Sequence, residues 1–439
     1  MKILWDDLQK LVPAGTRLLN GDGRALGGFC IDTRTLQPGE IFVAIKTASR
    51  DGHDFVPAAV TAGAAAVLVE HEVAGVPADL PQIVVPAGKD SQWLLRQIAA
   101  AYRRTFLKHV PVIGVTGSVG KTSTKDMLAH LLAGTLKVFA TPKNLNNTLG
   151  VPLNICRIEP GQHEIAVIEM GTNAPGEIAA CAAVAQPDFA VVTNVLPVHL
   201  QGLGSMDGIA DEKAAIAADP ACRAVFYRRL LKYRAFQKIA ARGNALVIDD
   251  TVPADHPARA LQSPSAGQVE NAVLALAVAK NFVKDPKILR ERLATWQPSQ
   301  KRGELRSRAN GHKIFVDCYN ASPFSMLDSV AAFHKAVGND STPRLHILGG
   351  MGELGSESQA LHRLVGEKLP LDPKRDFLAV FGGDAPLIAE GAAKNAFPRE
   401  HISIFDDIKE LRTFAQNFDG HIMLKGSRAF ALERACPED

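Results

Sequence analysis

The first hundred residues alternate between short apolar runs of strand length and segments with helical spacing of apolar side chains. The pattern predicts strands at 41–45, 65–69 and 82–85 and helices at 55–62 and 91–106. Strands that alternate with helices are typical of layered α/β domains, in which the helices cover a sheet. We therefore expect a small α/β domain over residues 1–108.

The middle part of the chain, residues 109–297, predicts a mostly parallel sheet. Its strands are expected at 112–116, 165–168 and 189–192, and its helices at 121–133 and 269–282. Successive residues of these strands are apolar, as in strands that are covered on both faces. Helices between such strands indicate right-handed crossover connections. Residues 219–267 show only a weak pattern, so no element is predicted there.

Residues 298–439 repeat the strand–helix alternation and predict a second, smaller doubly wound sheet. The expected strands are 313–316, 345–348, 377–381 and 421–424, and the expected helices are 325–336 and 356–368. The predicted fold class is therefore α/β with three domains.

Composition removes several classes of function. The chain has 439 residues and a net charge of +3, too small to give a general basic field for nucleic acid. Aromatic residues make up 6%, which argues against base-stacking platforms. No apolar run approaches the ~20 residues that span a bilayer, and Asp6 and Asp7 come too early for a signal peptide. The six cysteines are scattered, which fits a reducing cytosol. We expect a cytoplasmic protein without a nucleic-acid partner or a membrane span.

A glycine-rich turn between the strand at 112–116 and the helix at 121–133 is typical of a phosphate-binding loop. Its glycines let backbone N–H groups turn inward, and the helix directs its positive end toward an anion. The strict pattern is not met, because Val115 occupies the first glycine position. Lys121 is expected to neutralise phosphate charge, and the Thr122 hydroxyl to bind Mg²⁺. The ATP-binding residues predicted here are Gly117, Ser118, Gly120, Lys121, Thr122 and Ser123.

Polar side chains follow the next strands at the edge of the sheet where ligands bind in such folds. Glu169 ends one strand and could hold Mg²⁺, or be a solvated strand end. His199 follows the next strand and could be a ligand or a structural histidine. Lys213, read alone, is a solvated helix lysine. Asn146 and Asn147 lie in a polar loop that is either a simple turn or a contact to a phosphate or sugar.

Three stretches in the last third are the most specific: 317–326, 350–355 and 424–428. Together with segment 32–44 and the phosphate loop, they make the chain resemble the Mur ligases of peptidoglycan synthesis over nearly its whole length. Within that family, the three stretches are similar to the ligases that add D-alanyl-D-alanine to UDP-N-acetylmuramoyl-tripeptide.

This resemblance implies an ATP-dependent amide ligase that uses Mg²⁺ and an acyl-phosphate intermediate. Residues 1–108 would bind the UDP substrate, and 109–297 would form a P-loop ATP-binding ligase domain. Residues 298–439 would form a Rossmann-like domain that binds the incoming dipeptide and closes on ATP. The partners are the UDP-linked tripeptide and D-alanyl-D-alanine, and the chain is expected to be a monomer.

The resemblance also implies the roles of individual residues around the phosphate loop. Lys121, Lys213 and His199 would be catalytic. Thr122, Glu169, His199 and Lys213 would be metal ligands. In this family the lysine that matches Lys213 is carbamylated, which turns a cation into an anionic ligand.

Contacts to the substrates are implied in the same way. Asn271 would contact adenine, Arg302 would reach ATP from the third domain, and Asp317 would lie beside the ribose. The residues implied in substrate binding are Asn146, Asn147, Asn320, Lys425 and Ser427 in the cleft and Thr33, Arg34 and Lys46 on the UDP-binding face.

The chain departs from the family pattern at Ala174, at Gly267 and at Lys301, and its segment 219–267 is short. These departures keep open a non-catalytic, nucleotide-binding Mur-like scaffold. A Mur-type ligase with another acceptor, such as a folate-polyglutamate enzyme, also stays open, although the segment around Thr33 favours a UDP-sugar peptide.

Overall fold

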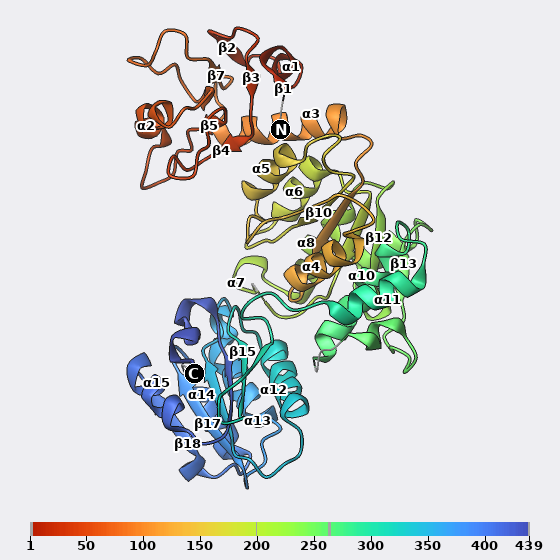
Figure 1. Ribbon diagram of the computed structural model, residues 1–439, viewed down its shortest axis with the longest axis vertical. Coiled ribbons are helices and arrows are strands. Elements are labelled where there is room, and N and C mark those ends of the chain that lie inside the picture. Colours follow the sequence, from red (N-terminus) through yellow and green to blue (C-terminus); the bar gives the residue numbers. More distant parts are fainter. Residues whose placement is uncertain (1–2, 199, 262–264, 438–439) are drawn as a thin grey trace.

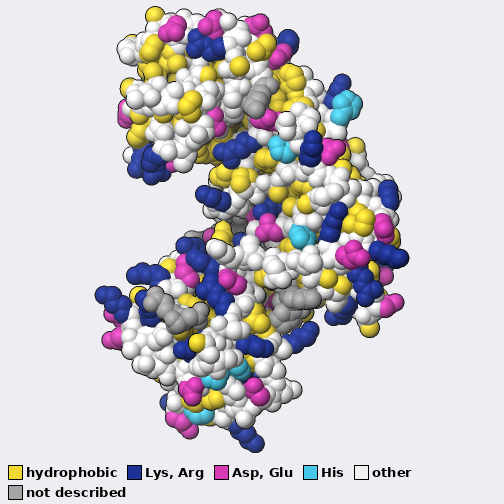
Figure 2. All heavy atoms as spheres, viewed as in Figure 1, with side chains coloured by type: hydrophobic (Ala, Val, Ile, Leu, Met, Phe, Trp, Pro, Cys, Tyr) yellow, Lys and Arg dark blue, Asp and Glu magenta, His cyan; other side chains and the backbone are white. Residues whose placement is uncertain are grey.

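The computed structural model describes residues 3–198, 200–261 and 265–437, and it contains three α/β units in a row (Figure 1). We call them the N-terminal, middle and C-terminal units, after the sheet that each contains. The row is bent, so that a hollow separates the N-terminal unit from the C-terminal unit on the face that Figure 2 shows. Lysine and arginine side chains gather along the rim of this hollow. Within the described ranges, every helix is too short or too polar to traverse a lipid bilayer.

The N-terminal unit has a five-stranded sheet in the order β2-β7-β6-β5-β4, with β2 antiparallel to β7 and the other pairs parallel. A short antiparallel pair, β1 and β3, follows the first residues. The predicted strands and helices of this unit are confirmed, with ends that differ by at most two residues. The elements are β1 (Ile3–Leu4), α1 (Trp5–Gln9), β2 (Arg17–Leu19), β3 (Ala25–Leu26), β4 (Phe29–Cys30), β5 (Ile41–Val43), α2 (Val56–Thr61), β6 (Ala66–Val69), β7 (Gln82–Val84) and α3 (Ser91–Phe106).

Helix α3 connects the N-terminal unit to the middle unit. The Asp90 side chain caps its first turn by accepting a hydrogen bond from Trp93 N, so the helix begins where the sequence predicts. The Tyr102 hydroxyl donates to the carbonyl of Ile158 at 2.8 Å. Arg103 forms an ion pair with Asp188 at 2.9 Å. The apolar face of α3 therefore belongs to one core that both units share.

The middle unit has a six-stranded parallel sheet in the order β13-β12-β11-β8-β10-β9. The predicted parallel sheet is confirmed, and its central strands are buried on both faces. The elements are β8 (Val112–Thr116), α4 (Lys121–Leu132), β9 (Val138–Ala140), α5 (Gly150–Arg157), β10 (Ile165–Glu169), α6 (Glu177–Ala185), β11 (Phe189–Val192), α7 (Leu200–Leu203), α8 (Met206–Ala214), β12 (Arg223–Tyr227), α9 (Arg234–Ala240), β13 (Leu246–Ile248), α10 (Ala266–Ala279) and α11 (Pro286–Thr295).

Strand β8 lies between β10 and β11. The chain forms β9 and β10 on one side of β8 and then crosses to form β11, β12 and β13 on the other side. In open α/β sheets a ligand crevice forms at the carboxyl ends of the strands at such a switch point. The phosphate-binding loop follows β8 directly. The topology therefore places this loop where ligands bind in folds of this kind.

The C-terminal unit has a six-stranded sheet in the order β14-β15-β19-β16-β17-β18, with apolar cores on both faces. The predicted doubly wound sheet is confirmed, with two strands that were not predicted: β14, an antiparallel edge strand, and β18, a parallel edge strand. The elements are β14 (Glu304–Ser307), β15 (Lys313–Asp317), α12 (Pro323–Val337), β16 (Arg344–Gly349), α13 (Ser358–Lys368), β17 (Asp376–Phe381), α14 (Pro386–Lys394), β18 (Ile402–Phe405), α15 (Ile408–Asn417) and β19 (His421–Lys425).

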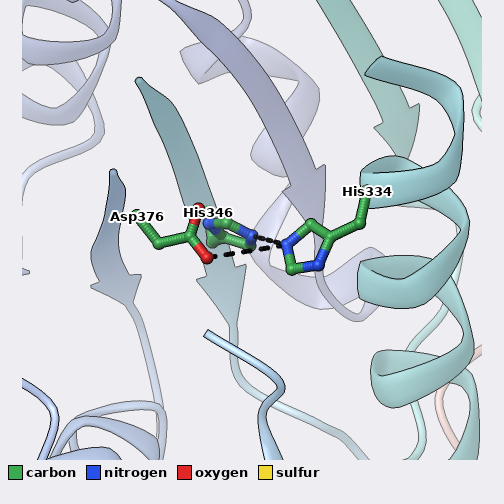
Figure 3. A group of neighbouring side chains, drawn as sticks. All are labelled: His334, His346 and Asp376. Atoms are coloured by element: carbon green, nitrogen blue, oxygen red, sulfur yellow. Dashed lines mark hydrogen bonds and ion pairs between the residues drawn. The ribbon is translucent and has the colours of Figure 1, made fainter. Parts of the chain in front are cut away.

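A buried polar cluster lies at the amino ends of β16 and β17 (Figure 3). The Nε2 atoms of His334 and His346 are 2.8 Å apart, and Asp376 Oδ2 is 3.8 Å from His334 Nε2. Two histidines and one carboxylate are ligand types of zinc sites. However, Arg344 donates to both oxygens of Asp376 at 2.5 and 2.8 Å, and Asp372 N donates to Oδ2 at 2.6 Å. The cluster is therefore explained as a hydrogen-bonded network that holds a neutral histidine pair.

This histidine pair predicts loss of stability in mild acid. Burial lowers the pKa of His334 to about 3 and that of His346 to about 4. An unfolded histidine takes up a proton near pH 6.5, so the stability that neutral histidines contribute is present above pH 6.5 and is lost as pH falls through the folded-state values. We expect each histidine to cost on the order of 2 kcal/mol of folding free energy at pH 5.

Urea unfolding at pH 7.5 and at pH 5.0, followed by circular dichroism, checks this prediction. The H334Q/H346Q variant is expected to lose less stability between the two pH values than the unsubstituted chain. An equal loss in both proteins would contradict the assignment of the acid sensitivity to this pair.

Candidate active site

A cavity of ≈ 300 Å³ lies between the middle and C-terminal units. One wall is the loop after β8, the end of β10 and the first turns of α10. The opposite wall comes from the carboxyl ends of β15 and β19, the loop after β16 and the first turns of α12. The cavity brings together most of the sequence-predicted site residues: Ser118, Gly120, Lys121, Thr122, Ser123, Asn146, Asn147, Glu169, Asn271, Arg302, Asp317, Asn320 and Lys425.

Two glycines of the phosphate-binding loop are required by close contacts. Gly120 precedes α4 with φ +82°, and a Cβ atom there would lie 2.6 Å from the Asn271 side chain. Gly117 has φ +146°, and a Cβ atom there would lie 1.9 Å from Thr193 Oγ1. Gly117 therefore packs against Thr193 and does not line the cavity. These two glycines let the loop backbone pack closely against Thr193 and Asn271.

Lys121 begins α4, and its ammonium group folds back over the loop. Its Nζ donates to the carbonyl oxygens of Gly117 at 2.8 Å and Ser118 at 3.1 Å. The side chain is half-buried. Burial lowers the pKa of Lys121, and the negative charge of Glu169 partly offsets this. The ammonium therefore stands at the loop where an anion would be neutralised.

Glu169 ends β10 and faces the first turn of α4. Its Oε1 accepts hydrogen bonds from Thr122 Oγ1 at 3.1 Å and from Asn146 Nδ2 at 2.8 Å. Its Oε2 is buried and has no hydrogen-bond partner among the described residues. An ionised oxygen in that position is costly unless a cation or water binds it. A hydroxyl and a carboxylate side by side are oxygen ligands that suit Mg²⁺.

Lys213 lies on α8 and is completely buried. Its Nζ has no hydrogen-bond partner within the described ranges. Burial lowers the pKa of Lys213 to about 7, and the charge of Lys121 adds to this effect. The neighbouring Glu212 does not pair with it and instead accepts hydrogen bonds from Gly176 N and Ile178 N, both at 2.7 Å. The reading of Lys213 as a solvated lysine is therefore wrong. His199 lies outside the described residues.

Polar contacts join the two walls near the start of α10. The Ser265 hydroxyl donates to Asp328 Oδ2 at 2.7 Å, and the Gln268 amide donates to the carbonyl of Arg302 at 3.1 Å. The guanidinium of Arg302 stacks on the ring of Tyr319, with 3.8 Å from its carbon to the ring centroid. Arg302 thus lines the cavity from the C-terminal unit, and the Tyr319 ring holds its guanidinium group in place.

The carboxyl ends of β15 and β19 carry a connected polar group. Lys425 Nζ donates to Asp317 Oδ2 and to the carbonyl of Asn320, both at 2.8 Å. Ser427 Oγ accepts a hydrogen bond from Gly352 N at 2.8 Å and is buried beside the cavity without lining it. These contacts join the loops that follow β15, β16 and β19 to one another.

The predicted UDP-binding residues lie in the N-terminal unit and do not line this cavity. Arg34 forms an ion pair with Asp32 at 2.5 Å, and Lys46 forms one with Asp51 at 3.6 Å. Thr33 precedes Arg34 on the same loop. The structure therefore does not bring Thr33, Arg34 and Lys46 together with the phosphate-binding loop.

Sequence reasoning did not single out three residues that line the cavity. Asn194 follows β11, and its Oδ1 accepts a hydrogen bond from Val119 N of the phosphate-binding loop at 3.0 Å. Tyr319 supports Arg302, and Glu353 follows β16. Asn194 and Glu353 lie in loops after strand ends, close to the position that Glu169 has at the end of β10, and this position is the signal that could have found them.

Comparison with known protein families finds matches along most of the chain. Three family models match in order along the chain: "Mur ligase family, catalytic domain" over residues 27–103, "Mur ligase middle domain" over 115–249 and "Mur ligase, glutamate ligase domain" over 301–428.

Two curated relatives and two solved structures cover the chain almost from end to end. The UDP-N-acetylmuramoyl-tripeptide–D-alanyl-D-alanine ligase of Bacillus subtilis is 33% identical over 92% of this chain and 91% of its own. That of Escherichia coli is 30% identical over 95% of each chain. MurF from Acinetobacter baumannii has a TM-score of 0.82 at 25% identity, covering 99% of this chain and 98% of its own. MurF from Thermotoga maritima in complex with ADP has a TM-score of 0.74 at 26% identity, covering 93% and 96%.

Proposed function

The chain belongs to the Mur ligase family, and from this premise we propose that it joins D-alanyl-D-alanine to UDP-N-acetylmuramoyl-tripeptide with ATP. One observation carries the proposal. A phosphate-binding loop and the strand ends of a second α/β unit line one cavity, so a nucleotide and an acceptor can meet there. The ligases of Bacillus subtilis and Escherichia coli carry that name, and the MurF of Thermotoga maritima was solved with ADP.

The donor set around Glu169 supports Mg²⁺ binding. Glu169 Oε2 is buried without a partner among the described residues, and the Thr122 hydroxyl lies beside the same carboxylate. We propose that Thr122 and Glu169 hold one Mg²⁺, and that a carbamylated Lys213 and His199 hold a second. When bound, Mg²⁺ supplies positive charge that offsets the repulsion between a carboxylate and the phosphates of ATP.

The loop and its lysine would act on ATP in the first step. The terminal carboxylate of the tripeptide attacks the γ-phosphorus, the bond to ADP breaks, and an acyl phosphate forms. Backbone N–H groups in the first turn of α4 and the Lys121 ammonium would bind the phosphate oxygens, on which negative charge gathers. Asn271, Arg302 and Asp317 would hold the nucleoside so that the γ-phosphorus lies in line with the carboxylate.

The second step forms the amide bond. The amine of D-alanyl-D-alanine attacks the acyl carbon, the carbon–oxygen bond to phosphate breaks, and the nitrogen loses a proton. Inorganic phosphate is then released. We propose that Asn320, Lys425 and Ser427 shape the dipeptide side of the cavity, and that Asn146 and Asn147 contact the tripeptide substrate. Lys425 is already paired with Asp317, which supports a structural part in this wall.

The N-terminal unit would hold the UDP part of the substrate through Thr33, Arg34 and Lys46, across the hollow in Figure 2. We place the domain boundaries near residues 108 and 298. We further propose that the chain works in the cytoplasm as a monomer.

Phosphate release tests the function. Purified chain is given ATP and Mg²⁺ with UDP-N-acetylmuramoyl-tripeptide and D-alanyl-D-alanine, and then with each of the two substrates omitted in turn. We expect release that requires both substrates, with a product whose mass equals their sum less one water. ATP binding without release in any mixture would favour a non-catalytic scaffold. Release with another amine alone would favour a ligase with a different acceptor.

A further inference from the structure

Helix α12 of the C-terminal unit lies against the amino end of α10 in the middle unit, and Asp328 joins the two. Its Oδ2 accepts a hydrogen bond from the Ser265 hydroxyl at 2.7 Å, and its Oδ1 accepts one from Gly267 N at 3.3 Å. Both oxygens of this carboxylate therefore bind the other unit. Asp328 also lines the cavity, so the contact is part of the candidate active site.

The amino end of α10 is suited to a carboxylate. The first N–H groups of a helix have no partner within the helix, and the helix dipole places positive charge there. The Ser265 side chain accepts a hydrogen bond from Gln268 N, which satisfies one of these groups from within the middle unit. Asp328 satisfies another from the C-terminal unit. Residues of two units thus cap one helix end.

Gly267 leaves room for the Asp328 carboxylate. A Cβ atom at this position would lie 3.2 Å from Asp328 Oδ2, which is a tight contact. A glycine within a helix is less favourable than an alanine, so its presence in α10 calls for a reason. Gly267 is also a position at which the chain departs from the family pattern. The Asp328 contact accounts for this departure, because a larger residue would press on the carboxylate.

The same end of α10 is connected to residues that are predicted to bind ATP. Asn271 lies one turn further along α10 and borders the phosphate-binding loop at Gly120. The Gln268 amide donates to the carbonyl of Arg302, which lines the cavity from the C-terminal unit. The docking of the C-terminal unit on α10 therefore sets the distance between Arg302 and the phosphate-binding loop. A misplacement of about 1 Å in a site can cost roughly 100-fold in rate.

We propose that Asp328 is a positioning residue, which docks the C-terminal unit on α10 and thereby keeps Arg302 within reach of ATP. This inference rests on the proposed function, because it concerns the use of ATP in the same site. Without the Asp328 contact, a smaller fraction of the ligand-free molecules would have the two units docked. The apparent affinity for ATP falls with that fraction, whereas saturating ATP restores the docked arrangement.

The D328A variant tests the proposal by separating KM from kcat. We expect the KM for ATP to rise roughly tenfold, the loss expected for one charge-assisted contact, while kcat at saturating ATP stays within about threefold. The Kd for ADP, measured by calorimetry without turnover, should rise by a similar factor. D328N keeps an oxygen acceptor, so its KM and Kd should fall between those of D328A and the unsubstituted chain.

Small-angle X-ray scattering measures the docking itself. We expect a larger radius of gyration for ligand-free D328A than for the unsubstituted chain. Saturating ADP with Mg²⁺ should remove most of this difference, because the nucleotide favours the docked arrangement.

Two further variants separate docking from a loss of stability. The Asp285 side chain caps α11 within the middle unit by accepting a hydrogen bond from Lys287 N. D285A should therefore lower the melting temperature and leave the KM for ATP unchanged. S265A removes the partner of Asp328 Oδ2. Because the two residues bind each other, D328A should weaken ADP binding less in the S265A background than it does alone.

An unchanged KM for ATP in D328A would overturn the proposal, and so would an unchanged radius of gyration. A fall in kcat with no change in KM would count against it equally, because that result indicates a loss of folded enzyme. Full additivity of D328A and S265A would show that the two residues do not act together. If the unsubstituted chain binds ADP but releases no phosphate, the proposed function fails, and the ADP measurements still test Asp328.

Discussion

Replacement of Lys121 by alanine is expected to reduce ATP-dependent turnover at least 100-fold. Its ammonium stands over the phosphate-binding loop, held by the carbonyl oxygens of Gly117 and Ser118. Removal of one preorganised charge of this kind costs about 3 kcal/mol or more of transition-state stabilisation. Phosphate release at saturating substrates measures the effect, and normal turnover would refute the phosphate-loop assignment.

The same substitution should leave the fold intact. Lys121 is half-buried, but its methylene groups are not part of an apolar core cluster, and burial of its charge disfavours the folded state. We therefore expect the free energy of unfolding to stay the same or to rise by less than about 1 kcal/mol. The matched control is K137A, which removes an exposed lysine of the same unit and should keep full turnover. A collapse of stability in K121A would mean that its low activity reports unfolding.

Much of the fold could be predicted because buried parallel strands leave a plain signal. β8, β10 and β11 are continuous apolar runs, and α3 has a capping aspartate and one apolar face. Between residues 219 and 267, β12 is a buried apolar strand with the same signal, which sequence reasoning missed, whereas β13 and α9 were not predicted for a physical reason. All three residues of β13 are half-buried, so it lacks the signal of a covered strand. Helix α9 is seven residues long, too short for a helical period to be recognised. β14 is also invisible to hydropathy, because most of it is exposed.

Some residues of the candidate site could also be found from the local sequence, and others could not. The phosphate-binding loop could be found because a glycine-rich turn directly follows a predicted strand. Glu169 could be found because it is the last residue of a predicted strand. Lys213 was assigned through the family resemblance alone, because a lysine between acidic and small residues, read by itself, is typical of a solvated helix. Its burial depends on how α8 packs against α6, and Glu212 makes that contact by bonding to Gly176 N. Such tertiary contacts have no signature in the residues next to Lys213.

Replacement of Lys213 by alanine is the second substitution with a large expected effect. A fully buried amine with no hydrogen-bond partner in the part of the chain that the structure describes is unfavourable for folding, so its presence calls for a role beyond packing. A carbamate formed on Nζ would supply an anionic oxygen ligand for a metal ion. We expect K213A to lose about 100-fold or more in turnover. Added acetate or formate should restore part of this activity by placing a carboxylate in the space that the side chain leaves.

A matched variant decides whether the rescue reports a carbamate. K213M fills the same space with an apolar side chain, so it should be equally inactive and should not respond to acetate. It should also be at least as stable as the unsubstituted chain, because it removes a buried amine without leaving a void. Rescue of K213A but not of K213M would locate the missing carboxylate at Nζ. Full activity of K213A without any added acid would remove Lys213 from the site and leave its burial unexplained by the ligase reaction.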